Sequence, residues 1–291
     1  VQYQRAIELA PENDGLYVKL AKYYQATQKW KETEAMYQRL ATRKPTSEIP
    51  QILLGEFYAF MGDSPQALAH FQRGTELNPK SDEARTSLIN FYLDNGQWGE
   101  AETLLKAEST SANNTVVHQL FQARLLLGRG KVDESIPLFQ RVIKDEPNLA
   151  MAHQYLGIAF AQKNEMTRAI EALSKAAQLA PENQGVRKAM VLARMAEGSY
   201  KLAVEEAQMA LRLNPKDVSA AHLLGEAYLR QKDFSQAKKV YQTIIEQMPQ
   251  DAIAHFQLGT IDLQDRQAKD ALDHFEAALQ QNPNFEQALG Q

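Results

Sequence analysis

Residues 48–81 read EIPQILLGEFYAFMGDSPQALAHFQRGTELNPKS, and this stretch contains the pattern that decides the fold. Its apolar side chains recur at helical spacing on both sides of a short turn at Gly62-Asp63. The second apolar series stops before Pro79, which has no amide donor and restricts the residue in front of it. The stretch therefore predicts a hairpin of two helices with these apolar positions: Leu54, Tyr58, Met61, Ala67, Leu68, Phe71 and Leu77.

The same pattern returns every 34 residues along the chain. Eight of the 11 prolines keep this spacing or a multiple of it, with one vacant slot at Asn113: Pro11, Pro45, Pro79, Pro147, Pro181, Pro215, Pro249 and Pro283. Small residues recur at position 8 of the repeat and at position 20, and an apolar residue, often aromatic, recurs at position 24. The pattern predicts eight repeats that start at residues 14, 48, 82, 116, 150, 184, 218 and 252.

In period and residue types the chain resembles the tetratricopeptide repeat. The resemblance covers residues 14–285 and implies an all-α, right-handed superhelix, an α-solenoid of helix-turn-helix repeats. Residues 1–13 are predicted to be the second helix of a truncated preceding repeat, and residues 286–291 the start of a truncated following one. We therefore expect a piece of a longer array, whose cut ends offer surfaces for self-association.

Composition excludes several classes of protein. The 291 residues include 32 Lys plus Arg and 36 Asp plus Glu, so the net charge of −4 lacks the basic excess of a nucleic-acid binder. No apolar run reaches the roughly 18 residues of a membrane span. Without cysteine the chain has no disulfides and no thiolate chemistry. The compartment stays open between the bacterial periplasm or envelope and the cytoplasm.

Chemistry-bearing motifs are absent from the sequence. Gly128-Arg129-Gly130 follows no strand and is in phase with the repeat turns, so it does not indicate a nucleotide site. The six histidines are scattered without metal-ligand spacing. Trp30 and Trp98 share position 17, which indicates packing rather than ligand stacking. We predict a non-enzymatic chain with no cofactor, no metal site and no catalytic residue.

The family resemblance implies that positions 2, 5, 9 and 12 of each first helix line a concave groove. Asn90 alone supplies asparagine at position 9, so neither the carboxylate clamp of chaperone-binding repeats nor the asparagine ladder of sugar-transferase arrays is present. The lining becomes more apolar from Leu120 to Met195, which predicts a protein or peptide partner with apolar anchors. The predicted partner-binding residues are Lys22, Glu56, Asn90, Leu120, Arg124, Gln154, Ile158, Lys188, Leu192, His222, Glu226 and Phe256.

Several residues depart from the repeat. The polar stretch 108–115 replaces the end of a second helix and favours a loop, read either as a frayed helix end or as a hinge or contact loop. Pro137 falls inside a second helix and is expected to kink or delay it, whereas Pro65 falls near a helix start and is expected to be harmless. Arg194 and Asp262 occupy position 11, which is usually aromatic, and are either partly exposed or paired with a neighbour.

The hypothesis for function is a scaffold that binds a partner peptide or helix in the groove, within a larger bacterial assembly. Junctions such as 179–183, LAPEN, resemble those of long bacterial arrays that accompany exopolysaccharide export and envelope protein sorting. The alternative is a regulatory or substrate-docking region of a larger enzyme such as a glycosyltransferase.

Overall fold

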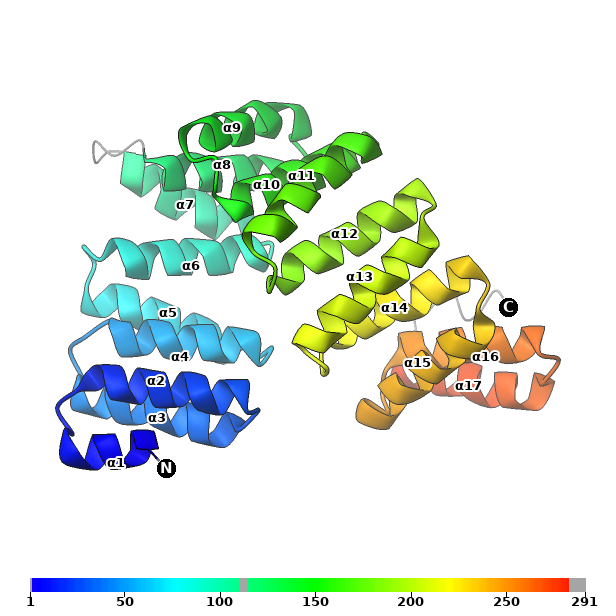
Figure 1. Cartoon of the computed structure of the whole chain (residues 1–291), viewed down its shortest axis with the longest axis horizontal. Helices are drawn as coiled ribbons and strands as arrows, with labels where there is room; N and C mark the ends of the chain where they lie inside the picture. Colours follow the sequence, from blue (N-terminus) through cyan, green and yellow to red (C-terminus); the bar gives the residue numbers. More distant parts are fainter. Residues whose placement is uncertain (1, 110–114, 283–291) are drawn as a thin grey trace. The chain divides into compact units, whose positions relative to one another are not determined.

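In the computed structural model, the described residues 2–109 and 115–282 form helices and connecting turns, with no strand among them (Figure 1). This confirms the predicted all-α class. The chain divides into two compact units, Val1–Lys131 and Val132–Gln291, and each unit is described by itself. The division falls in the turn that follows α8.

In the first unit, helix α1 precedes three helical hairpins and the first helix of a fourth. The helices are α1 (Gln2–Leu9), α2 (Asp14–Ala26), α3 (Trp30–Arg43), α4 (Ile49–Phe60), α5 (Ser64–Leu77), α6 (Asp82–Asp94), α7 (Trp98–Ser109) and α8 (Val116–Gly128). The second unit begins with the second helix of that repeat. Its helices are α9 (Val132–Asp145), α10 (Ala150–Gln162), α11 (Met166–Leu179), α12 (Gln184–Glu197), α13 (Tyr200–Leu213), α14 (Val218–Gln231), α15 (Phe234–Gln247), α16 (Ala252–Gln264) and α17 (Ala268–Gln281).

Close packing within each hairpin explains the small residue at position 8. A Cβ added to Gly225 of α14 would lie 2.5 Å from the ring of Tyr241 on α15. A Cβ added to Gly55 of α4 would lie 2.7 Å from the ring of Phe71 on α5. The aromatic ring at position 24 thus occupies the space that a side chain at position 8 would need, and both rings are buried.

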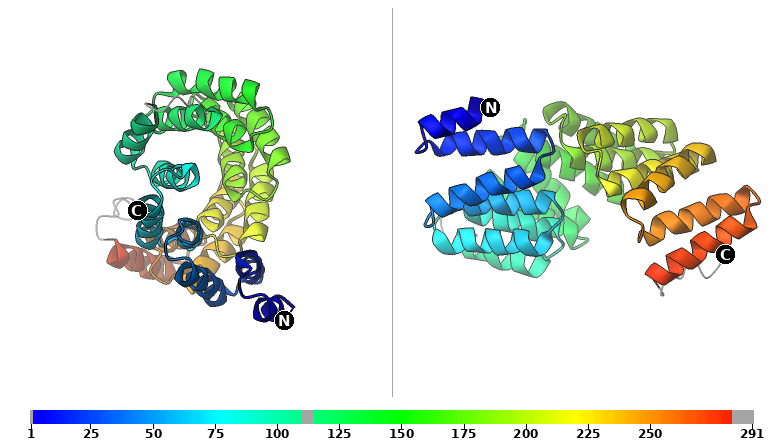
Figure 2. Two further views of the ribbon diagram at one scale, coloured as in Figure 1. Left: turned by 90° about the vertical axis from the view of Figure 1, so that its left-hand side faces the viewer. Right: turned by 90° about the horizontal axis from the view of Figure 1, so that it is seen from below.

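Within each unit the hairpins stack so that first helices approach one another. Helix α4 contacts α6, α6 contacts α8, α10 contacts α12, and α12 contacts α14. Among the described residues, no two consecutive second helices make comparable contact. Such a stack curves with its first helices on the inner side, and Figure 2 shows the two layers of helices within the second unit, coloured from green to orange.

The recurring proline closes the turn between repeats. The amide of Ser81 donates to the carbonyl of Asn78 across Pro79 at 3.0 Å, and the amide of Asp217 donates to the carbonyl of Asn214 across Pro215 at 3.1 Å. Proline suits the second residue of such a turn because its φ is already fixed near the required value. The same hydrogen bond spans Pro11, Pro45, Pro147, Pro181 and Pro249.

Polar residues after four of these turns cap the next first helix. The side chains of Ser81, Asn183, Asp217 and Asp251 each accept a hydrogen bond from the amide three residues ahead. Asn13 occupies the corresponding place before α2, but its side chain accepts no such bond. Asp14 beside it instead lies 3.2 Å from Lys44 Nζ.

The structure shows the conformation at most of the residues that depart from the repeat pattern. The expected delay at Pro137 is wrong, because α9 begins at Val132, the same repeat position at which other second helices begin. Pro65 lies in the first turn of α5, as predicted. Helix α7 continues to Ser109, so the first two residues of the predicted loop 108–115 are helical, while residues 110–114 lie outside the described part of the chain, as do residues 286–291.

Both charged residues at position 11 are paired. Asp262 is 1% exposed, and its Oδ1 lies 2.6 Å from Lys238 Nζ of the preceding helix. Arg194 lies 3.0 Å from Glu197, one turn further along α12. Pairing rather than a looser fold therefore accommodates charge at a position where five of the other six repeats carry an aromatic ring and the sixth carries Leu126.

Candidate functional site

The inner surface formed by the first helices is the candidate partner-binding surface, and it is described separately for each unit. In the first unit it receives predicted residues from four helices: Lys22 from α2, Glu56 from α4, Asn90 from α6, and Leu120 and Arg124 from α8. In the second unit the residues are Gln154 and Ile158 from α10, Lys188 and Leu192 from α12, His222 and Glu226 from α14, and Phe256 from α16.

The side chain of Arg124 is hydrogen-bonded to two side chains of the neighbouring helix α6. Its guanidinium donates to Asn90 Oδ1 at 2.5 Å and to Asp94 Oδ1 at 2.6 Å, while Asn90 also donates to Asp94 at 3.1 Å. Arg124 is only 3% exposed, and so is Leu120 one turn earlier. These two side chains support the surface, whereas Asn90 remains half-exposed on it.

Lys22, Glu56 and Glu83 form an accessible charged group on the same unit. The pKa of the Glu56 carboxyl is raised, first because surrounding protein removes part of its hydration and second because Glu83 is close; Lys22 opposes the shift. Lys22 thus offsets part of the repulsion between Glu56 and Glu83. This end of the surface has a mild acidic character.

In the second unit, two of the predicted partner-binding residues, Lys188 and His222, contact aspartates that cap helices. Lys188 Nζ lies 3.0 Å from Asp217 Oδ2, and the other oxygen of Asp217 accepts from the amide of Ala220 at 3.0 Å. His222 Nε2 lies 2.9 Å from Asp251 Oδ2, and the other oxygen of Asp251 caps α16. Each aspartate therefore caps one first helix and links it to the first helix before it.

The rest of this surface is apolar or neutralised. Glu226 lies 3.4 Å from Arg230 on α14. Leu192 is 53% exposed, Ile253 is 49% exposed and Leu263 is 40% exposed, at positions 9, 2 and 12 of their repeats. Gln154, Ile158 and Phe256 are half-buried beside them. The surface presents scattered apolar side chains next to charges that already have partners.

No catalytic arrangement emerges from the part of the chain that the structure describes. Nδ1 of His255 lies 3.2 Å from Nδ1 of His274, but no three ligating side chains come together in the ranges 2–109 and 115–282. Trp30 and Trp98 pack against the cores, as predicted. Among these described residues, none of the helices has both the length and the hydropathy to span a bilayer.

Family comparison agrees with the repeats. Profiles of the tetratricopeptide repeat match residues 61–125 and 194–258, and a second profile of the same repeat matches residues 122–183. The chain belongs to the tetratricopeptide-repeat family. A sequence comparison with curated proteins gave no match.

Solved structures share the fold. YrrB, described as a TPR protein with an unusual peptide-binding site, has 20% identity and a TM-score of 0.52, covering 64% of this chain and 95% of YrrB. TTC0263, a thermophilic TPR protein of Thermus thermophilus, has 21% identity and a TM-score of 0.55, covering 63% of this chain and 100% of its own. MamA of Desulfovibrio magneticus RS-1 has 21% identity and a TM-score of 0.55, covering 60% of this chain and 98% of the MamA chain. At these identities the likeness concerns the fold alone.

Proposed function

We propose that the chain is a non-enzymatic interaction scaffold that binds a peptide or helix of a partner protein on the inner first-helix surface. The observation that carries the proposal is the exposure of Leu192, Ile253 and Leu263 on the second unit, beside charges that are paired within the chain. Exposed apolar side chains surrounded by polar groups are typical of interaction surfaces.

The pairing of charges bears on the kind of partner. Lys188, His222 and Glu226 each interact with another side chain of the chain itself, so a partner would have to break these contacts to use them. Apolar anchors of an amphipathic segment can instead contact the leucines and the isoleucine without that cost. We therefore expect binding to change little between low and high salt.

The test compares two sets of exposed apolar residues. Leu192→Glu together with Ile253→Glu places two negative charges on the proposed surface, whereas the control Leu272→Glu places one on α17, at a side chain that is 56% exposed on a second helix. The intact protein is used to capture its partner from the source cells, and the isolated partner is then titrated against each variant. Each groove substitution should weaken binding about tenfold, in the range of interface hot spots.

The outcome that contradicts the proposal is equal affinity for the groove variant and for the Leu272→Glu control, with both variants folded by circular dichroism. Leu120 is unsuitable for this test because it is buried, so a charge there would act on stability.

The more specific predictions, about the type of repeat array and its cellular location, are part of the same proposal. The junction residues 179–183 support a place among bacterial arrays of the envelope or exopolysaccharide-export type, and fractionation of the source cells would test this. The remaining predictions, a docking region of a larger enzyme, self-association and the lack of nucleic-acid binding, stay predictions.

A further inference from the structure

Two histidines face each other within the hairpin of α16 and α17. His255 lies on α16 at position 4 of its repeat, and His274 lies on α17 at position 23. Their Nδ1 atoms are 3.2 Å apart, and both side chains are half-buried. The two helices pack directly against each other (Figure 1), so the fold holds the two rings together while solvent can still reach them.

The hydrogen bond of His255 to the backbone determines which of its ring nitrogens has a lone pair. Nε2 lies 3.0 Å from the carbonyl oxygen of Pro249, which can only accept, so Nε2 carries the hydrogen. His153 makes the same bond to the carbonyl of Pro147 at 2.9 Å, again six residues earlier in the chain. The turn between repeats therefore fixes this orientation, and in the neutral ring the Nδ1 lone pair is on the side of His274.

The ring of His274 has a carboxylate behind it. Its Nε2 lies 3.7 Å from Asp262 Oδ2, and Asp262 is 1% exposed. A carboxylate in this place favours a hydrogen on Nε2, which leaves a second lone pair on Nδ1. Histidines that bind metals usually direct their other ring nitrogen at a carboxylate or a backbone carbonyl, and here the two histidines do so.

The separation of the two Nδ1 atoms fits zinc. A tetrahedral zinc ion with bonds of about 2.0–2.1 Å separates its ligand atoms by about 3.3–3.4 Å. A square-planar copper ion with bonds of similar length would need about 2.9 Å. The observed 3.2 Å is closer to the tetrahedral value. Within residues 2–109 and 115–282 no third ligating side chain joins the pair, so water would complete the coordination.

The charges near the pair do not oppose a cation. Of the charged groups that act on His274, the one cation, Lys238, lies 2.6 Å from Asp262 and is neutralised by it. Asp270, one turn before His274 on α17, adds a second carboxylate. Burial lowers the pKa of His274, and His255 and Lys238 lower it further, while Asp262 and Asp270 raise it. The ring is therefore neutral at pH 7, which is the form that binds metals.

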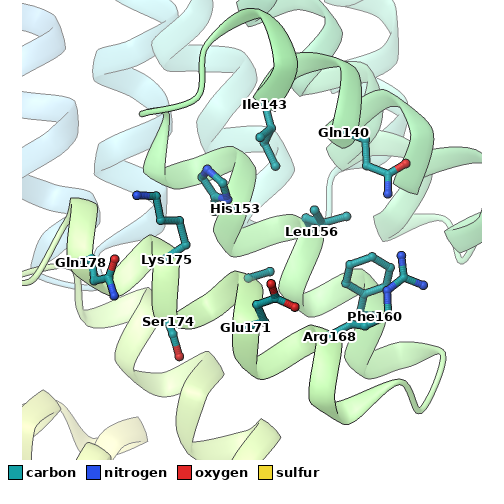
Figure 3. A pocket seen from close by; sticks show the side chains of 11 residues that line it. Gln140, Ile143, His153, Leu156, Phe160, Arg168, Glu171, Ser174, Lys175 and Gln178 are labelled. Carbon is teal, nitrogen blue, oxygen red and sulfur yellow. The ribbon is translucent and has the colours of Figure 1, made fainter.

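Other repeats carry at most one histidine at these two positions. In the second repeat the position 4 residue is Gln51, whose Oε1 lies 2.8 Å from His70 Nδ1 at position 23. In the fifth repeat His153 is at position 4, but position 23 is Ala172. Figure 3 shows His153 among the side chains that line a crevice of the second unit, and none of the others is a histidine. The eighth repeat alone supplies two imidazoles.

We propose that His255 Nδ1 and His274 Nδ1 together bind one zinc ion, which links α16 to α17. In the metal-free protein a hydrogen bond from His274 Nδ1 to His255 Nδ1 satisfies both nitrogens. On binding, that hydrogen is transferred to Nε2 of His274, opposite Asp262, and both Nδ1 lone pairs bind the metal. The spacing of the histidines along the sequence predicts no metal site, because these two are 19 residues apart and meet only in the folded hairpin.

The experiment titrates zinc chloride into the full chain, without a histidine tag and in a buffer that does not bind metal, by isothermal titration calorimetry. We expect saturable binding of one zinc ion per chain. His255→Gln should weaken it at least tenfold and keep the fold, because glutamine at this position can accept from His274 as Gln51 accepts from His70. Zinc should also slow hydrogen exchange in α16 and α17 but not in α2 to α5, because a ligand stabilises the structure that it binds.

His153→Gln is the matched control. It removes a histidine with the same backbone hydrogen bond but without a second imidazole, so zinc affinity should not change. Leu192→Glu should also leave zinc affinity unchanged, so this proposal and the proposed partner surface can fail separately. The zinc proposal is overturned by absence of binding up to millimolar zinc, by equal affinity of the wild type and a folded His255→Gln variant, or by an equal loss of affinity in His153→Gln.

Discussion

At the scale of single residues, the turn within each hairpin imposes one unusual backbone conformation. Position 15 has a positive φ in every repeat, at Gly62, Gly96, Gly130 and Gly198 and at the non-glycine residues Gln28, Asn164, Lys232 and Arg266. Glycine adopts this left-handed region freely, whereas a residue with a Cβ is strained there by roughly 1–2 kcal/mol. Half of the repeats therefore contain local strain that the other half avoid.

Replacing Lys232 by glycine should stabilise the protein. The relief of strain at its φ of 64° is partly offset by the greater freedom of glycine in the unfolded chain, which leaves a gain of about 0.5–1 kcal/mol. The free energy of unfolding in urea measures the gain. Asn164→Gly is the control, because asparagine tolerates this region better and should gain less. Equal gains at both positions would show that Cβ strain is not the cause.

Asp217 combines two functions in one carboxylate, and substitutions can separate them. Asp217→Ala removes both the helix cap and the Lys188 ion pair and should cost about 1–2 kcal/mol of stability. Asp217→Asn keeps a cap and should cost less than about 1 kcal/mol, since the pair is partly exposed. A double-mutant cycle with Lys188→Met isolates the ion pair, and a coupling energy near zero would contradict the pairing.

At the scale of helices, local sequence signals predicted much and missed the links between repeats. Apolar spacing, glycine turns and the periodic prolines act within a few residues, so they indicate helices and turns directly. The contact between Lys188 and Asp217 joins residues 29 apart, and that between Arg124 and Asn90 joins residues 34 apart. A short-range pattern does not reveal which side chain of the next repeat lies opposite.

A hydrogen bond between repeats was also missed, although its signal is present in the sequence. Tyr24, Tyr92 and Tyr228 share position 11, and a glutamine precedes each by twenty residues. Only the structure shows that each glutamine and tyrosine of these pairs are hydrogen-bonded.

A substitution in helix α9 measures how much an interior proline lowers the free energy of unfolding in this fold. Pro137 lies at the sixth residue of α9, where it cannot donate to the carbonyl of Asp133. Pro137→Ala restores this donor and should stabilise the protein by about 1–2 kcal/mol, after the loss of proline's restriction of the unfolded chain is subtracted. Urea unfolding gives the change, and slower hydrogen exchange within α9 would locate it.

Pro65→Ala is the matched control for that substitution. Pro65 lies in the first turn of α5, where no helical partner exists for an amide, so its replacement should bring no gain. A gain at Pro65 equal to that at Pro137 would indicate an effect on the unfolded chain rather than on the helix.

At the scale of the whole molecule, contacts are local in sequence. Within the part that the structure describes, every pair of helices in substantial contact is one or two helices apart along the chain. Stability in such an array is close to a sum of repeat and nearest-neighbour terms. A destabilising substitution in the core of one unit should therefore increase local unfolding mainly in the substituted repeat and its neighbours.

Phe71→Ala is such a destabilising core substitution in the first unit. The ring is buried against Gly55 and lies 5.4 Å from Phe91, and its removal should cost about 3–5 kcal/mol locally. Hydrogen exchange followed by mass spectrometry should show faster exchange in α4 to α7, because these helices share the affected core. Peptides from α13 to α16 should exchange at the wild-type rate.

Leu173→Ala is the reciprocal substitution in the second unit, where the side chain is fully buried beside Gly157 and Met190. It should accelerate exchange in α10 to α13 and leave α2 to α5 unchanged. Nearest-neighbour coupling predicts that the two patterns are complementary, and that the double variant shows their sum. If either substitution accelerates exchange equally in all described helices, the chain unfolds as one cooperative unit, and its two compact units are not energetically separate.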